Sequence, residues 1–188
     1  MIIKPKVGMF WGMERRMGLG PSPTPSGGGD GLIGWYGADA GSSGYGNISH
    51  FYSLFTTQTP GTINYIHTKV YSVHYTNYVN VAIYNSSKVK LAQGTKIIGD
   101  LGEPQKMDFT LNTPITLVAA TTYYLCLFSN SVEFGIGRNA ATGIDFYYHN
   151  GQEDPAWVDT MPDPLPDGDI YGTDMTAWIY ADNTATQP

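Results

Sequence analysis

The sequence predicts an all-β domain, a two-sheet antiparallel sandwich of the jelly-roll type, preceded by an extended N-terminal arm. Three observations support this prediction. The 188 residues include 14 tyrosines, 23 glycines and 12 prolines, a composition that favours strands and turns over helix interiors. Short alternating segments recur roughly every ten residues, which is the spacing of sandwich strands. No segment shows a convincing helical period, so we expect nine or ten strands and no helix.

The chain divides into two parts, an arm over residues 1–31 and a sandwich domain over residues 32–188. The second half of the arm reads "GPSPTPSGGGDG", a Gly/Pro/Ser tract typical of linkers. The first half is unusually apolar for a tail, because disordered tails normally lack large hydrophobic residues. We therefore expect the arm to be covered by a neighbouring molecule, through these predicted anchor residues: Ile2, Ile3, Lys4, Lys6, Val7, Phe10, Trp11, Arg15 and Arg16.

Charge is unevenly distributed between the two parts. The whole chain has a net charge of −6. The arm has four basic and two acidic residues, a balance of +2, which leaves six basic and fourteen acidic residues, a balance of −8, in the domain. An acidic domain argues against nucleic acid as the main partner. The basic arm is suited to contact an acidic surface, including that of another copy of this chain.

The first predicted strands lie near Leu32 and over Ser49–Thr56, with the glycine-rich stretch "GADAGSSGYG" as a loop between them. Pro60-Gly61 forms the next turn. The following segment alternates, and we expect its two faces to carry these two sets: Ile63, Tyr65, His67, Lys69 and Tyr71 on one, and Asn64, Ile66, Thr68 and Val70 on the other.

The middle of the domain contains the clearest alternation. The segment "NYVNVAIYN" places Val79, Val81 and Ile83 on one face. Its other face carries Tyr78, Asn80, Ala82 and Tyr84. A turn at "NSSK" and a short strand in "LAQGTKIIG" follow.

The second half of the domain predicts further strands. In "KMDFTLN", Met107, Phe109 and Leu111 alternate with polar residues. A turn at Ala119–Thr121 separates two strands in "TPITLVAATTYYLCLFSN", and "VEFGIGR" and "GIDFYYHN" supply two more. The acidic, proline-rich stretch that ends at Asp174 is expected to be a long ordered loop, and "DMTAWIYAD" a single closing strand.

Between about Ser53 and Asn130 the chain resembles a diffuse group of jelly-roll modules. The resemblance lies in "PGTINYIHTKVY", "VNVAIYNSSKVKLAQGT" and "ITLVAATTYYLCLFSN", where Ala119-Ala120-Thr121 replaces the usual glycine-containing turn. Such modules occur in bacteriophage virion proteins and in extracellular bacterial proteins. The resemblance implies a role in adhesion, carbohydrate contact or particle decoration, and no catalysis. The arm lies outside it.

Few residues indicate a catalytic or metal-binding role. The single cysteine, Cys126, lies in the apolar run "YYLCLF" and is expected to be a buried core residue. The four histidines, His50, His67, His74 and His149, show no metal-binding spacing. No Gly-x-Ser-x-Gly motif is present, and no pattern identifies the carboxylate pair of a glycosidase. We therefore expect a protein that is not an enzyme.

Two features near the C-terminus predict ligand binding, one of a calcium ion and the other of a glycan. Seven carboxylates lie between Glu153 and Asp174 with no basic residue. A calcium ion held by Asp163, Asp167 and Asp169 is one interpretation, and a solvated loop stiffened by prolines is the other. The aromatic residues Tyr147, Tyr148, Trp157 and Tyr171 lie near these carboxylates and form a predicted glycan-binding set, with core or subunit packing as the alternative.

Two functions remain open. The first is a structural component of a bacteriophage particle, such as a capsid decoration, fibre or tail-appendage protein. This chain would contact other virion proteins through its arm, and by analogy would form a homo-oligomer such as a trimer. The absence of a visible secretion signal or of an apolar run of transmembrane length agrees with a virion product assembled in the host cytoplasm. The alternative is an extracellular carbohydrate-binding module.

Overall fold

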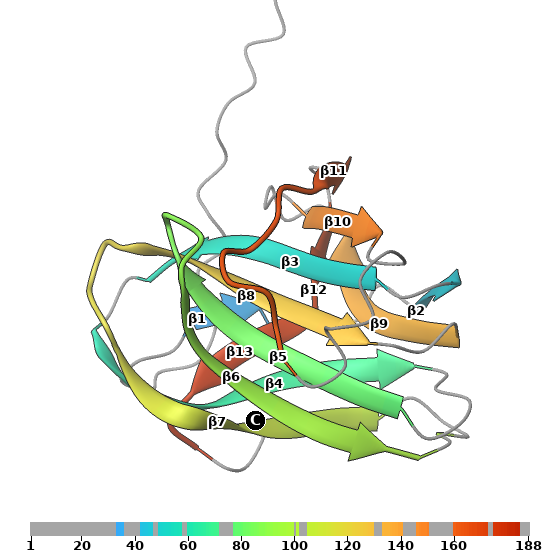
Figure 1. Ribbon diagram of the computed structural model, residues 1–188, viewed down its shortest axis with the longest axis horizontal. Coiled ribbons are helices and arrows are strands. Elements are labelled where there is room, and N and C mark those ends of the chain that lie inside the picture. Colours follow the sequence, from blue (N-terminus) through green and yellow to red (C-terminus); the bar gives the residue numbers. More distant parts are fainter. Residues whose placement is uncertain are drawn as a thin grey trace, which may run out of the picture.

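The computed structural model describes residues 33–35, 42–46, 49–57, 60–71, 77–99, 101, 105–129, 133–140, 146–150, 160–172 and 175–184. These residues form thirteen strands in two antiparallel sheets that pack face to face (Figure 1). The predicted all-β two-sheet sandwich is therefore confirmed. No helix of the described residues is long and apolar enough to cross a membrane.

The first sheet has seven strands, in the order β1-β13-β4-β9-β12, with β7 also paired to β4 and β2 also paired to β9. Its strands are β1 (Ile33–Trp35), β2 (Ser42–Gly46), β4 (Gly61–Tyr71), β7 (Gln105–Leu117), β9 (Glu133–Ala140), β12 (Met175–Ala177) and β13 (Ile179–Asp182).

The second sheet has six strands, in the order β11-β10-β3-β8-β5-β6. They are β3 (Ser49–Thr56), β5 (Asn77–Asn85), β6 (Lys90–Ile98), β8 (Thr122–Ser129), β10 (Phe146–Asn150) and β11 (Asp169–Gly172). From β3 to β10 the chain passes between the sheets at every connection except β5 to β6. Repeated crossing of this kind is a property of jelly-roll sandwiches.

The main core lies between the sheets and follows the predicted alternation. Val79, Val81 and Ile83 on β5 are fully buried, as are Leu125 and Leu127 on β8. These side chains form one cluster with residues of the facing sheet: Ile33, Ile63, Ile66, Val70, Met107, Phe109, Leu111, Ile115, Leu117, Ile136, Ile179 and Ala181. Cys126 is also buried, as expected, although it faces the opposite side of its sheet, in the cluster that contains Tyr52 and Tyr84.

One predicted face assignment is wrong, because β4 contains an irregularity. The β4–β7 register shifts between Ile63, which lies opposite Ile115, and Tyr65, which lies opposite Thr110, so the regular pairing of the two strands is interrupted there. Ile63 consequently joins Ile66 and Val70 in the core cluster, and does not share a face with Tyr65 and His67. A break in the alternation reverses the facing of the residues beyond it, so alternation alone could not place both ends of β4.

Three other expectations need correction. The stretch expected to be a loop between the first two predicted strands contains β2, which pairs with β9. The closing segment is two strands, because Trp178 interrupts it, and the Trp178 amide donates to the Gly137 carbonyl oxygen at 2.7 Å. The acidic stretch is not all loop, since Asp169–Gly172 forms β11 against β10.

The two sheets meet along one side of the sandwich, where β6 and β7 lie side by side. The backbone amide of Gln93 on β6 donates to Asn112 Oδ1 on β7 at 3.1 Å. Gly94 permits this approach, because a Cβ there would lie 2.7 Å from the Thr110 carbonyl oxygen. The edge of β6 is thereby covered, which reduces its ability to pair with another chain.

Candidate functional site

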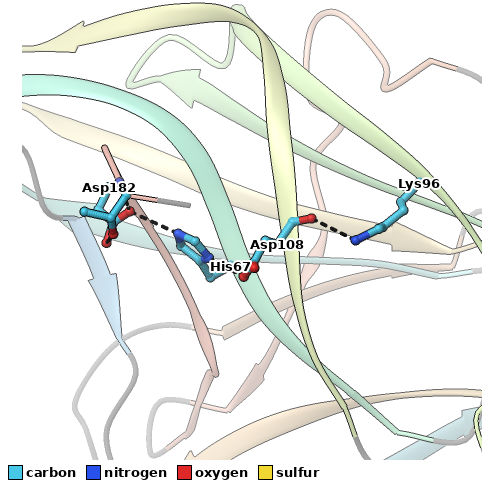
Figure 2. A network of polar contacts seen from close by, with 5 residues as sticks. His67, Lys96, Asp108 and Asp182 are labelled. Carbon is cyan, nitrogen blue, oxygen red and sulfur yellow. Dashed lines mark hydrogen bonds and ion pairs between the residues drawn. The ribbon is translucent and has the colours of Figure 1, made fainter. Parts of the chain in front are cut away.

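A buried histidine network on the outer side of the seven-stranded sheet is the most chemically distinctive feature of the described residues. His67 lies on β4 and its side chain is 0% exposed. Its Nδ1 lies 2.7 Å from Asp108 Oδ1 on β7, and its Nε2 lies 3.0 Å from Asp182 Oδ1 on β13 (Figure 2). The ring is held between two carboxylates that belong to the strands on either side. We refer to His67, Asp108 and Asp182 as the His67 network.

Strand register brings these residues together. His67 is directly opposite Asp108 in the β4–β7 pair and directly opposite Tyr180 in the β4–β13 pair. The Tyr180 ring stacks on the imidazole, with centroids 4.6 Å apart and planes 23° apart. Asp182, two residues beyond Tyr180, lies on the same face of β13. Cross-strand neighbours of this kind are close enough to interact strongly.

The carboxylates are themselves positioned by further contacts. Asp182 Oδ1 accepts from the Thr184 amide at 2.8 Å, and Asp182 Oδ2 accepts from the Thr184 hydroxyl at 2.9 Å. Lys96 on β6 donates to the Asp108 carbonyl oxygen at 3.2 Å, as Figure 2 shows. The network therefore extends from the C-terminal end of β13 to the side where the two sheets meet.

The surroundings favour the charged form of His67. Burial acts to lower the His67 pKa, but hydrogen bonds and charge interactions with Asp182 and Asp108 outweigh it and raise the pKa above its ordinary value. The Asp182 pKa shifts in the opposite sense. Burial acts to raise it, and the bonds from His67 and Thr184 lower it overall. Both shifts are those of an ion pair between imidazolium and carboxylate.

The geometry fits a structural role better than a catalytic one. A general base needs a free nitrogen lone pair within reach of substrate. In the imidazolium form, both His67 nitrogens carry protons and donate to carboxylates. The side chain is also closed to solvent. We therefore interpret the network as a polar connection between β7, β4 and β13.

A second cluster covers the outer face of the six-stranded sheet. Residues 160–168, which we call the 160–168 segment, cross in front of β3, β8 and β5 (Figure 1). Met161 and Leu165 of this segment are 1% and 2% exposed. They pack with side chains from the strands: Tyr52, Ala82, Tyr84, Cys126 and Phe128. Burial of both sheet faces explains why β8 reads as a nearly continuous apolar run.

Polar contacts fix the 160–168 segment in place. The Tyr84 hydroxyl donates to the Pro162 carbonyl oxygen at 2.9 Å, and the Tyr52 hydroxyl to that of Pro166 at 3.3 Å. The Leu165 amide donates to the Lys88 carbonyl oxygen at 2.9 Å. Lys90 Nζ donates to the Met161 carbonyl oxygen at 2.6 Å. Proline-rich backbone is thus bonded along its length to the β5–β6 hairpin and to β3.

The predicted calcium residues have protein partners in this segment. Asp163 Oδ1 accepts from the Lys90 amide at 3.0 Å, and Asp167 pairs with Lys88 Nζ. The Lys88 ammonium also holds the pKa of Asp167 below its ordinary value. The Asp169 backbone lies in β11, and its side chain falls outside the described part. Over the described residues, no three or more His, Cys, Asp or Glu side chains are arranged so that they could hold a metal ion. Calcium binding stays a prediction.

The predicted glycan-binding residues are only partly placed. Tyr147 on β10 is half-buried, and its ring stacks on Tyr52 with centroids 4.9 Å apart and planes 7° apart. Tyr148 and Tyr171 lie on β10 and β11, with side chains beyond the described atoms. Trp157 lies outside the described residues, as does the whole predicted anchor set, residues 1–31. The Tyr147–Tyr52 stack shows that aromatic packing accounts for at least this member of the set.

Sequence reasoning did not find the His67 network. Its three members are at positions 67, 108 and 182, so no local spacing connects them. The usable signal was alternation, which placed His67 on the face of β4 opposite Ile66. A histidine predicted to lie within a strand of a compact domain requires a polar partner, but the sequence does not say which one.

No protein-family model matches this chain, and no curated protein matches it by sequence.

Proposed function

We propose that this chain is a structural component of a bacteriophage particle, a capsid decoration, fibre or tail-appendage protein. In this proposal residues 1–31 attach it to other virion proteins and the sandwich is displayed. The observation that carries the proposal is the difference in composition between the arm, residues 1–31, and the sandwich domain that follows it. A sandwich with a densely buried interior follows an apolar, basic segment and a Gly/Pro/Ser tract.

The energetic argument concerns the apolar residues of the arm. Burying Ile2, Ile3, Phe10 and Trp11 against a neighbour would contribute roughly 6–12 kcal/mol before the entropy of ordering the arm is subtracted. The charge balance of +2 on the arm and −8 on the domain favours a contact with the acidic surface of another copy. We expect the assembly to be a homo-oligomer, with a trimer as the working hypothesis.

The first test compares the full chain with a variant lacking residues 1–20. The deletion should leave the unfolding midpoint of the sandwich unchanged, and should abolish association measured by sedimentation. A full-length variant that carries Ile2→Ser, Ile3→Ser, Phe10→Ser and Trp11→Ser is the matched control for chain length. Association of either variant at the wild-type level would refute the anchoring role.

Carbohydrate binding is the second candidate function. Tyr147 on β10 is only partly buried although its ring stacks on Tyr52, and this remaining exposure is the observation that favours it. A partly exposed aromatic ring suits a sugar, because the C–H face of the sugar packs on the ring and nearby polar groups bond to its hydroxyls. The test is retention on insoluble polysaccharides and on a glycan array. Retention that disappears in Tyr147→Ala and persists in the arm variants would support it. No retention of the wild-type chain on any glycan would exclude it.

A further inference from the structure

The His67 network joins β13, the pairing partner of β1, to β4 and so to the rest of the sheet. The arm leads into β1, and β1 pairs with β13 at the end of the seven-stranded sheet. β13 in turn pairs with β4 through residues 179–182, opposite Tyr65–Thr68. His67 and Asp182 connect β4 and β13 by their side chains, in addition to these backbone bonds.

The contact between β1 and β13 is close and specific. Gly34 has a φ of +114°, and a Cβ at this position would lie 2.4 Å from the Ile179 carbonyl oxygen. The adjacent Ile33 is 1% exposed and belongs to the main core. A shift of β13 away from β4 would therefore move β1 with it.

Both side-chain bonds of the network need the imidazolium form. A neutral imidazole has one N–H, so it can donate to Asp108 or to Asp182 but not to both. The other nitrogen would then direct a lone pair at a carboxylate oxygen about 3 Å away. Loss of the proton thus converts two attractive contacts into one attractive and one repulsive contact.

Among the described residues, the other charged or titratable groups near His67 lie on four strands. On β4 these are Tyr65, whose ring centroid is 6.2 Å from that of His67, and Lys69. On β7 they are Asp108 and Lys106, and Lys106 lies over the Trp178 ring. On β13 they are Asp182 and Tyr180, and from β6 Lys96 reaches the Asp108 carbonyl oxygen. His67 is the cation that bonds to both carboxylates.

We propose that protonation of His67 acts as a pH-dependent lock on β13 and, through β13, on β1, so that these two strands are held at acidic pH and loosened as pH rises. This inference does not depend on the proposed particle function, since it concerns the sandwich alone.

The direction follows from linkage. A histidine whose pKa is raised by folding contributes its full stability below its unfolded value of 6.5. This contribution to stability decreases as pH rises from 6.5 to the folded pKa, and it is absent at pH values above the folded pKa. Asp182, whose pKa is lowered, contributes above its unfolded value of 3.8 and loses its contribution as pH falls through the folded pKa. The lock is therefore strongest between about pH 4 and 6.5.

The primary experiment measures urea unfolding of the full chain from pH 5 to 9, for the wild type and for His67→Gln. We expect the wild-type folding constant to fall by up to about tenfold per pH unit above 6.5, relative to the variant. Ionisation of the buried thiol and tyrosines also affects stability in alkali, but it is common to both chains and cancels in the comparison. Lys96→Gln is the matched control, because it removes a contact of the network and leaves the ring between its carboxylates. Its pH profile should follow the wild type.

Two direct measurements keep the proposal testable if His67→Gln fails to fold. The ring nitrogens of His67, observed by NMR in the wild type, should lose a proton only above pH 6.5, and Asp182→Asn should lower the pH at which they titrate. Hydrogen-exchange protection factors of β1 and β13 should fall with pH more than those of β5 and β8. Each of three results would overturn the proposal. One is titration of His67 at or below pH 6.5, and another is the same pH dependence of unfolding in the wild type and His67→Gln. The third is a fall of hydrogen-exchange protection with pH that is equal in all four strands.

Discussion

Gly94 on β6 lies so close to Thr110 on β7 that a Cβ at position 94 would be 2.7 Å from the Thr110 carbonyl oxygen. The same Cβ would be 3.2 Å from Phe109 Cβ. The obstacle is backbone, which cannot move aside as a flexible side chain would. The closest approach of the two sheets along this side therefore depends on the absence of a side chain at Gly94.

We predict that Gly94→Ala lowers the free energy of unfolding by about 1–3 kcal/mol, because overpacking forces β6 away from β7. The measurement is urea unfolding followed by tryptophan fluorescence. Gly99→Ala is the matched control, since a Cβ at Gly99 meets no atom within 4 Å. The control should unfold within about 0.5 kcal/mol of the wild type. Equal effects of the two substitutions would contradict this account of the β6–β7 contact.

The turn between β7 and β8 supports a stabilising prediction. Ala120 has a φ of +55°, in the left-handed region that costs an L-residue with a Cβ about 1 kcal/mol and costs glycine almost nothing. Its amide still donates to the Thr57 carbonyl oxygen at 2.9 Å, so the conformation is fixed by the fold. We predict that Ala120→Gly raises the thermal unfolding midpoint.

The neighbouring position provides the control for this substitution. Ala119 is in the same turn but has no positive φ, so Ala119→Gly only adds freedom to the unfolded chain. It should lower the midpoint or leave it unchanged. If both glycine variants shift the midpoint in the same direction, the left-handed strain at Ala120 is not what limits this turn.

Much of the fold could be predicted because it depends on local patterns. The alternation in β5 placed Val79, Val81 and Ile83 in the core, and the turn at Ala119–Thr121 was found from sequence alone. The irregularity between Ile63 and Tyr65 was not found, because no residue there signals a break in the alternation.

The candidate site was harder to predict because it depends on long-range register. Asp108 and Asp182 were assigned to outward faces or strand ends, where carboxylates are common and carry no specific meaning. Their relation to His67 exists only once β7 and β13 are paired on opposite sides of β4. The second covered face was missed for the same reason. The alternation puts Tyr84 on a face with Tyr78 and Asn80, and only the distant 160–168 segment makes that position interior.

We predict that the 160–168 segment contributes substantially to stability. Leu165 is 2% exposed and packs among the strand side chains of the second cluster. Leu165→Ala should cost about 2–5 kcal/mol in the free energy of unfolding, as for other buried leucines. Leu91→Ala is the matched control, because Leu91 is 37% exposed on β6. A cost for Leu165→Ala no larger than for Leu91→Ala would mean that the segment does not form part of the folded core.

The thiol of Cys126 provides a test of the folded state as a whole, because it is the single cysteine of the chain. Burial raises the pKa of this thiol, and the side chain is fully enclosed in the second cluster. The thiolate is the reactive form, so an alkylating reagent should reach Cys126 only when the chain unfolds. At pH 8 we predict a reaction in native buffer slower than in denaturant by a factor of about a thousand or more.

The control for thiol reactivity is a cysteine at an exposed turn. Ser87 lies in the turn between β5 and β6 and is exposed, so Ser87→Cys in a Cys126→Ala background should react rapidly in native buffer. The modification rate of Cys126 should then rise in Leu165→Ala and Gly94→Ala in proportion to their loss of stability. Rapid modification of native Cys126, at a rate near that of the Ser87→Cys thiol, would show that the outer face of the six-stranded sheet opens without global unfolding. The 160–168 segment would then be a movable cover over that face, and the stability assigned to Leu165 would have to be measured as local opening.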